Sequence, residues 1–132
     1  MFEFVGLLAN RVDNYPHEFS AGMRQRAIIA MSMICNPDLI IADEPTSALD
    51  VIVQDQIMQD LKDLQKKTKF AMILISHDLA LIMGTCERIA VMYAGKMVET
   101  GSSTSIFQNP CHPYTSALLS ATPTIRGSGR KL

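Results

Sequence analysis

The stretch that decides the fold lies between residues 39 and 50 and reads Leu39-Ile40-Ile41-Ala42-Asp43-Glu44-Pro45-Thr46-Ser47-Ala48-Leu49-Asp50. Four aliphatic or small residues in a row predict a strand buried on both faces, as strands of parallel α/β sheets are. A proline then ends the strand directly behind two acidic residues. The stretch therefore places Asp43 and Glu44 at the carboxyl end of a strand, where parallel sheets bind their ligands.

Two adjacent carboxylates in that position suit the hydrolysis of a magnesium nucleotide. Asp43 can hold Mg²⁺, directly or through water, because this small hard cation prefers oxygen ligands. Glu44 can polarise a water that attacks a γ-phosphate. The same Asp-Glu-Pro sequence is also an ordinary exit from a strand with solvated charges, so this stretch alone leaves both interpretations open.

A second motif, Phe19 to Met23, stands about twenty residues upstream and opens a predicted amphipathic helix. The apolar residues of that helix follow at the spacing i, i+3, i+4, i+7 and are Ala27, Ala30, Met31 and Ile34. Ser20 is therefore expected at the helix N-cap, where free backbone N–H groups and the helix dipole form an anion site. The alternative is that Ser20 only caps the helix and Gly22 only allows a tight turn.

A third motif is His77, which follows another continuous apolar strand from Phe70 to Ser76. If the two strands are neighbours in a parallel sheet, His77 lies beside the two carboxylates and can contact a γ-phosphate. A surface or core histidine satisfied by hydrogen bonds is the alternative interpretation.

In this order the motifs resemble the C-terminal half of the nucleotide-binding domain of ATP-binding cassette (ABC) transporters. The matching segments are Phe19–Met23 for the signature motif, Leu39–Glu44 for the Walker B strand with its catalytic glutamate, Ser47–Asp50 for the D-loop, and His77 for the switch histidine. The resemblance extends from Tyr15 to about Gly101. Residues 15–18 and the tail Asn109–Thr115 narrow it to oligopeptide and dipeptide importers, a subfamily that also contains nickel and glutathione importers.

The resemblance implies an α/β fold. This would be part of a P-loop NTPase (ABC ATPase) fold, with a mostly parallel sheet flanked by helices and the N-terminal lobe missing. Residues 1–35 would belong to the helical subdomain with the signature motif, residues 36–108 to the C-terminal part of the ATPase core, and residues 109–132 to a C-terminal extension and tail.

The resemblance also implies an ATPase that uses ATP and Mg²⁺. In the family, two nucleotide-binding subunits sandwich two ATP molecules head to tail. The residues that would meet the nucleotide held by the other subunit are Ser20, Ala21, Gly22 and Met23. In the chain's own site, Asp43 would help to bind Mg²⁺, Glu44 would activate water, His77 would contact the γ-phosphate and Asp50 would link the two sites.

By the same resemblance, hydrolysis would energise the import of peptides or related small solutes through transmembrane permease subunits. An extracytoplasmic solute-binding protein would take part indirectly. The chain would be peripheral, held at the cytoplasmic face of the plasma membrane by the permease. Because the solute is recognised by those partners, this subunit does not reveal whether it is a peptide, nickel or glutathione.

Two departures from the family pattern affect this interpretation. Ala21 stands where the family has a glycine, and its Cβ disfavours a positive φ. No G-x-x-x-x-G-K-[ST] phosphate loop occurs, and the single Gly-Lys pair, Gly95-Lys96, is predicted to be a hairpin turn. We therefore expect a fragment that is inactive in isolation. The alternative is a non-catalytic truncated or split-gene module that pairs with an intact nucleotide-binding subunit.

Composition agrees with half of a cytosolic domain. The chain has 132 residues, 48% of them hydrophobic, which is enough for one core. A net charge of −1 gives no reason to expect nucleic acid as a partner. No apolar run reaches the length of a membrane span. The three scattered cysteines are expected to be reduced thiols.

The remaining elements follow from periodicity and turn residues. We expect helices over Phe2–Leu8, from Ser20 to about Cys35, over the apolar face Val53, Ile57, Leu61 and Leu64, and up to about Cys86, then hairpin strands Arg88–Ala94 and Lys96–Thr100 and helical turns at Ser102–Phe107. From Thr122 onward the composition predicts a disordered tail.

Overall fold

The computed structural model describes residues 5–47 and 49–122 and divides into two compact units, Met1–His77 and Asp78–Leu132. The tail predicted from Thr122 onward lies almost entirely outside the described residues, as do the first three residues of the helix predicted over Phe2–Leu8. The other residues of that predicted helix, 5–8, form no α-helix.

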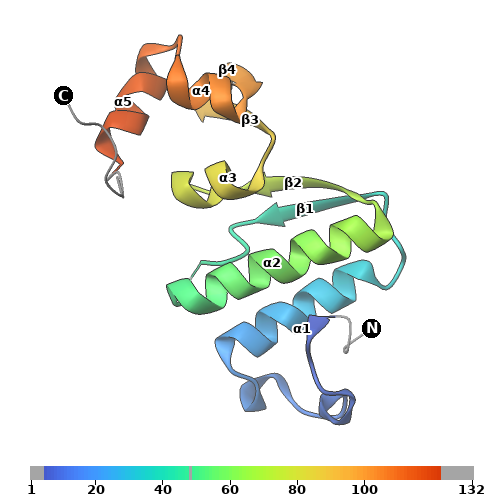
Figure 1. The fold of residues 1–132 in the computed structure, drawn as a ribbon. Helices are drawn as coiled ribbons and strands as arrows, with labels where there is room; N and C mark the ends of the chain where they lie inside the picture. The colour runs from blue at the N-terminus through green and yellow to red at the C-terminus, as the bar shows by residue number, and fades with distance from the viewer. Residues whose placement is uncertain (1–4, 48, 123–132) are drawn as a thin grey trace, which may run out of the picture. The chain divides into compact units, whose positions relative to one another are not determined.

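The first unit is a parallel strand pair with two helices on one side. Its elements are the 3₁₀ helices η2 (Ala9–Arg11) and η3 (Pro16–Glu18), then α1 (Ala21–Met33), β1 (Leu39–Asp43), α2 (Val51–Thr68) and β2 (Ala71–Ile75). Strands β1 and β2 pair in parallel, with Leu39 opposite Ala71 and Asp43 opposite Ile75. Helix α2 is the crossover between them and lies between the strand pair and α1 (Figure 1).

Helix α2 has the apolar face that its sequence predicts. Ile57, Leu61 and Leu64 are buried, and Val53 is half-buried at the first turn. The helix ends at Lys69, whose left-handed backbone (φ 61°) lets its N–H reach the carbonyl oxygen of Gln65 at 2.7 Å. This end is the usual left-handed helix stop, formed here without glycine.

Helix α1 buries a different face from the predicted one. Ala30 is buried as expected, but Met31 and Ile34 are each 61% exposed. The buried apolar residues are Ile29, Ala30 and Met33. Ile29 and Met33 continue the helical stripe of Gly22 and Arg26, both of which approach residues of α2. The contact with α2, which lies later in the chain, therefore determines which face is buried.

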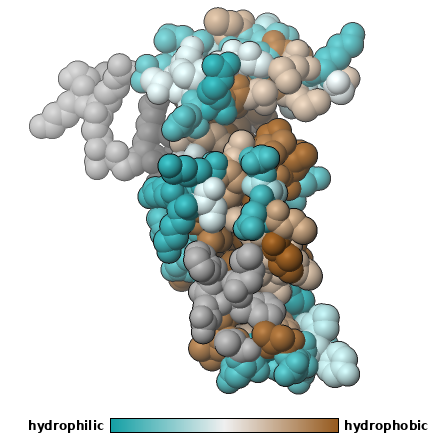
Figure 2. Space-filling model, turned by 90° about the vertical axis from the view of Figure 1, so that its right-hand side faces the viewer, coloured by the Kyte–Doolittle hydropathy of each residue, from teal (hydrophilic) through white to brown (hydrophobic). Residues whose placement is uncertain are grey.

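The strand pair is not buried on both faces, contrary to the prediction from its apolar run. One face carries half-buried residues, whereas the side chains of the other are 47–62% exposed; these are Leu39, Ile41, Ile73 and Ile75. Both helices of this unit lie on one side of the strands, so they cover one face only (Figure 1). Figure 2 shows hydrophobic side chains at the surface among hydrophilic ones.

The second unit is a β-hairpin with three helices. Its elements are α3 (Leu79–Thr85), β3 (Arg88–Tyr93), β4 (Lys96–Ser102), α4 (Ser103–Gln108) and α5 (Pro113–Ala121). The hairpin is antiparallel and turns at Ala94 (φ 48°) and Gly95 (φ 75°), the paired positive φ angles of a type I′ turn. The predicted hairpin turn is confirmed. The described residues thus form one parallel and one antiparallel strand pair, whereas the sequence predicted a mostly parallel sheet.

A small core holds the second unit together. Ile89, Val91 and Ile106 are buried, and Tyr114 and Leu118 of α5 pack against them. Helix α5 was not predicted from the sequence. Its signal is a proline at the first helical position with Tyr114 and Leu118 at i, i+4 spacing.

In the part of the chain that the structure describes, no disulfide joins Cys35, Cys86 and Cys111. None of the described helices is both long and apolar enough to cross a membrane.

Candidate functional site

The carboxyl ends of β1 and β2 bring a glutamate and a histidine together. Because the strands are parallel and in register, the residues after Asp43 and Ile75 leave the sheet at the same edge. The N–H of Glu44 donates to the carbonyl of Ile75 at 2.9 Å. His77 then meets the Glu44 carboxylate twice: its ring Nδ1 lies 2.7 Å from Oε1, and its backbone N–H donates to the same oxygen at 3.1 Å. The predicted proximity of His77 to the Glu44 carboxylate is present.

Glu44 is held in a left-handed backbone conformation, with φ of 45°. Such a conformation costs a non-glycine residue about 1–3 kcal/mol and persists only where surrounding contacts fix it. Here the Glu44 carbonyl accepts hydrogen bonds from the backbone N–H and the hydroxyl of Ser47, at 3.2 and 3.0 Å. The Glu44 N–H is fixed on Ile75. The strain therefore aims the Glu44 side chain away from the strand line, toward His77.

The side chains of this cluster are accessible. The His77 side chain is 83% exposed and that of Glu44 is 37% exposed, so the interpretation of His77 as a core histidine is wrong. With a carboxylate as acceptor, Nδ1 of His77 is the protonated ring nitrogen.

Asp43 is exposed at the last position of β1, next to this pair. In the described ranges no group of three or more His, Cys, Asp or Glu side chains forms a metal cage. Mg²⁺ does not require one, because it usually keeps several waters and takes one or two carboxylates together with substrate phosphates. An accessible carboxylate oxygen at this edge fits that donor set.

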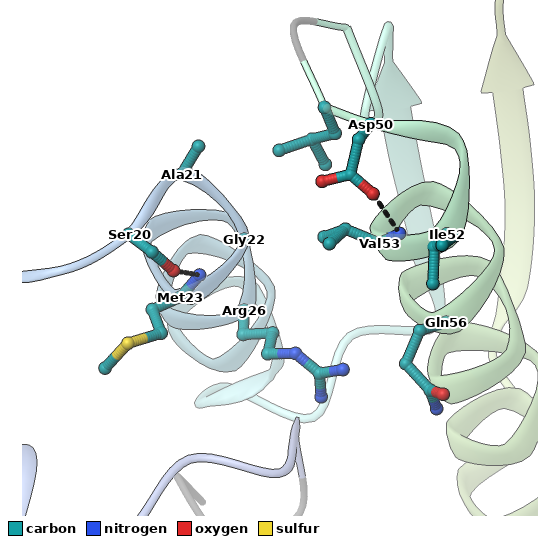
Figure 3. A pocket seen from close by; sticks show the side chains of 10 residues that line it. Ser20, Ala21, Gly22, Met23, Arg26, Asp50, Ile52, Val53 and Gln56 are labelled. Atoms are coloured by element: carbon teal, nitrogen blue, oxygen red, sulfur yellow. Dashed lines mark hydrogen bonds between the residues drawn. The ribbon is translucent and has the colours of Figure 1, made fainter.

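A second group of predicted residues lines a groove between the first turns of α1 and α2 (Figure 3). Each helix begins with a side-chain cap: Ser20 Oγ accepts the N–H of Met23 at 3.2 Å, and Asp50 Oδ1 accepts the N–H of Val53 at 3.0 Å. The groove measures about 430 Å³ and is lined by Ser20, Ala21, Gly22, Met23, Arg26, Leu49, Asp50, Ile52, Val53 and Gln56.

The structure therefore sorts the predicted residues into two groups. Glu44 and His77 are in direct contact, with Asp43 beside them in sequence. The segment Ser20–Met23 and Asp50 share the groove, whose lining includes none of those three residues. Ser20 and Asp50 act as helix caps, and the cap at Ser20 is the one expected from the sequence.

Gly22 has a packing role that the sequence did not reveal. It lies inside α1 rather than in a tight turn, and a Cβ built on it would come within 2.8 Å of Val53 Cγ1 in α2. The missing side chain thus allows the two helices to approach closely at the groove. Ala21 is the first residue of the helix and is not among the positive-φ residues, so its Cβ causes no backbone strain here.

Arg26 is a groove residue that sequence reasoning missed. Its Nη1 pairs with Asp60 Oδ2 of α2 at 2.5 Å and also donates to the carbonyl of Val5 at 2.6 Å. The signal was its position four residues after Gly22, which places both on one face of a helix. Arg26 ties α1 to α2 one helical turn beyond the glycine contact.

Comparisons with known proteins agree with this geometry. The family described as ABC transporter matches residues 1–47, and the family described as oligopeptide/dipeptide transporter, C-terminal region, matches residues 98–132. The oligopeptide transport ATP-binding protein OppD of Bacillus subtilis is 52% identical over 99% of this chain and 37% of its own length. The dipeptide transport ATP-binding protein DppD of Haemophilus influenzae is 57% identical over 86% of this chain and 34% of its own.

Solved structures show the same fold. The ATP-binding cassette MJ0796, in a dimeric post-hydrolysis state bound to ADP and Pi, matches with a TM-score of 0.66 and 29% identity over 77% of this chain and 44% of that one. CbiO1 of Clostridium perfringens, part of the ABC transporter complex cbiONQ, matches with a TM-score of 0.74 and 28% identity over 82% of this chain and 43% of that one.

These comparisons show that the fold is part of an ABC ATPase fold and that the chain belongs to the ATP-binding cassette family. Within that family it groups with the ATP-binding proteins of oligopeptide and dipeptide transport. The chain spans roughly two-fifths or less of the length of the two relatives named above.

The close contact at Gly22 predicts the effect of adding one methyl group. Gly22→Ala gains helix propensity of about 1 kcal/mol, but overpacking against a stiff β-branched valine costs about 1–3 kcal/mol. We expect a net loss of stability of up to about 2 kcal/mol in urea unfolding. In a Val53→Ala background, the same Gly22→Ala change is expected to stabilise.

Gly84 of α3 is the matched control, because an added Cβ there meets no atom within 4 Å. Gly84→Ala is expected to stabilise by up to about 1 kcal/mol from propensity alone. With the natural Val53 in place, Gly22→Ala could instead stabilise as much as Gly84→Ala. The close approach of α1 to α2 at Gly22 would then not be present in solution.

Proposed function

We propose that this chain supplies the catalytic edge and the signature helix of an ATP-hydrolysing subunit that energises peptide import through an ABC permease. The observation that carries the proposal is the contact between Glu44 and His77 at the carboxyl ends of two parallel strands. The names of the relatives support the assignment to peptide transport.

In this proposal Glu44 is the general base for the attacking water. Both donors of His77 contact Oε1 of Glu44, so we assign Oε2 to the water. A carboxylate fixed by two hydrogen bonds and by a strained backbone does not need to reorganise when the proton arrives. His77 orients this carboxylate through Nδ1, and in the imidazolium form its exposed ring also donates from Nε2 to a γ-phosphate oxygen.

Bound Mg²⁺ would supply charge neutralisation for the nucleotide phosphates. Asp43 is the residue of this cluster that we assign to hold it, because its carboxylate is exposed at the end of β1. The residues Ser20–Met23 and Asp50 lie in the separate groove. This separation supports a head-to-tail pair in which the groove of one subunit meets the nucleotide of the other.

The partners that we propose are a second nucleotide-binding subunit and the permease, with the solute-binding protein involved indirectly and no nucleic acid. The chain would then be peripheral at the cytoplasmic face of the membrane. The division into residues 1–35, 36–108 and 109–132 is part of the same proposal.

A second candidate function is a non-catalytic module that pairs with an intact nucleotide-binding subunit. The exposed apolar side chains of the strand pair favour it, because a face of this kind calls for a covering partner. This candidate keeps the groove and the signature helix but assigns no reaction to Glu44.

Glu44→Gln distinguishes the two candidates in a complete transporter that carries this segment. The amide keeps the size of the side chain but cannot accept a proton, and loss of a general base costs about 10² to 10⁴ in rate. We expect ATP binding to persist, ATP-bound dimers to accumulate and phosphate release to fall by that factor. Glu87→Gln, on an exposed residue of the second unit, is the control. Normal turnover in the Glu44 variant would leave only the non-catalytic candidate.

His77→Ala is expected to lower turnover without a change in thermal midpoint. The side chain is largely exposed, and the backbone N–H of residue 77 still reaches Glu44. His17→Ala removes another exposed histidine of the same unit and is the matched control. A drop in melting temperature with unchanged specific activity would make His77 a structural residue only.

The isolated 132-residue chain is expected neither to bind Mg-ATP tightly nor to hydrolyse it. Phosphate affinity in P-loop proteins comes from the backbone cradle and lysine of a phosphate loop, and no such loop occurs in this sequence. Isothermal titration and a phosphate-release assay test this. Micromolar binding, or turnover that Glu44→Gln abolishes, would show that the chain is self-sufficient.

A further inference from the structure

The tail motif singled out in the sequence contains an unusual arrangement of backbone donors. Between Pro110 and Pro113 stand only Cys111 and His112, and proline has no N–H. The segment therefore offers two donors, side by side in the chain. Both donate to the same side chain: the N–H of Cys111 reaches Oε1 of Glu99 at 2.7 Å, and the N–H of His112 reaches Oε2 at 3.0 Å.

This turn leads directly into the last helix of the second unit. His112 is the N-cap of α5, and its Nδ1 accepts the N–H of Tyr114 at 3.1 Å. Pro113 occupies the first helical position, where an N–H would have no partner within the helix, so proline costs no hydrogen bond there. One histidine thus donates its backbone N–H to Glu99 and accepts a hydrogen bond from the helix, so the Glu99 contact and the start of α5 are continuous.

The helix is then docked on the hairpin by apolar contacts. The rings of Tyr93, at the end of β3, and Tyr114 lie with centroids 4.4 Å apart. Leu118, one turn later, packs on the core formed by Ile89, Val91 and Ile106. Glu99 itself lies on β4, so its carboxylate links β4 to the turn that begins α5. Strand β3 contacts the same helix through Tyr93.

The charge of Glu99 belongs to this arrangement. The N–H of Cys111 is the largest influence that lowers the pKa of Glu99 below its usual value, followed by the hydroxyl of Thr115 and then the N–H of His112. Thr115 is a buried residue of α5. Hydrogen bonds to an ionised acceptor are roughly twice as strong as neutral ones.

We propose that Glu99 and the turn Pro110–Pro113 form a latch that fixes the start of α5 on the β3–β4 hairpin. The two prolines remove competing donors and restrict the backbone, and the carboxylate receives both remaining donors, one on each oxygen. The motif Pro-Cys-His-Pro-Tyr is thereby assigned a role as a carboxylate-binding turn. Without the charge of Glu99, the start of α5 separates from the hairpin more often, while the pairing of β3 with β4 is unaffected. The latch lies in the second unit and does not rest on the proposed ATPase function.

Amide hydrogen exchange on the whole 132-residue chain tests the latch. Glu99→Gln keeps the side-chain length but leaves one acceptor oxygen for two donors. We expect exchange at Cys111, His112 and the α5 amides to rise about tenfold or more relative to the β3–β4 amides in the same sample, because a bond to a charged acceptor is lost. Glu87→Gln, on the exposed residue just before β3, should leave that ratio unchanged.

A second variant keeps the charge and shortens the arm. Glu99→Asp is expected to give an exchange ratio between those of the natural protein and Glu99→Gln, since a carboxylate remains available to one of the two donors. An unchanged ratio in Glu99→Gln would overturn the latch. This includes the case in which exchange rises equally in hairpin and helix, because Glu99 would then support the unit as a whole. If Glu99→Gln does not fold, the ratio in Glu99→Asp decides in the same way.

Discussion

The parallel pairing of β1 with β2 is the constraint on which the candidate catalytic edge depends. Its register places Asp43 against Ile75, so the next residues of both strands emerge side by side. The bond from the Glu44 N–H to the Ile75 carbonyl extends the pairing past the end of β1 and turns the glutamate toward His77. The crossover helix α2 supports this pairing, because its buried residues Ile57 and Leu61 belong to the core of the unit.

The second constraint is the approach of α1 to α2. The absent side chain of Gly22 sets the spacing at Val53, and the pair Arg26–Asp60 ties the helices one turn further along. The two capped helix ends consequently border one groove, although about thirty residues separate Ser20 from Asp50 in the chain. A change at Gly22 or Arg26 would therefore act on the groove in two ways, because both residues line it and both hold α1 against α2.

The two units use local chemistry in different ways. In the first unit, a glutamate in a strained backbone holds a histidine at an exposed edge. In the second, a glutamate on β4 accepts the backbone N–H groups of the two residues that stand between two prolines. A carboxylate organises the backbone in both cases, but only Glu44 stands at the carboxyl end of parallel strands, where a phosphate ligand is expected.

The sequence by itself determined the features that depend on neighbours within a few residues. These include the four strands, the helix start at Ser20, the apolar face of α2 and the turn at Gly95, because capping, periodicity and turn chemistry are local properties. Only the tertiary structure decided the left-handed Glu44, the packing role of Gly22 and the buried face of α1. It also decided that the apolar side chains of the strand pair stay exposed on one face. The first three depend on contacts with residues far away in the chain, and the last depends on which helices cover the strands. No local sequence pattern encodes either.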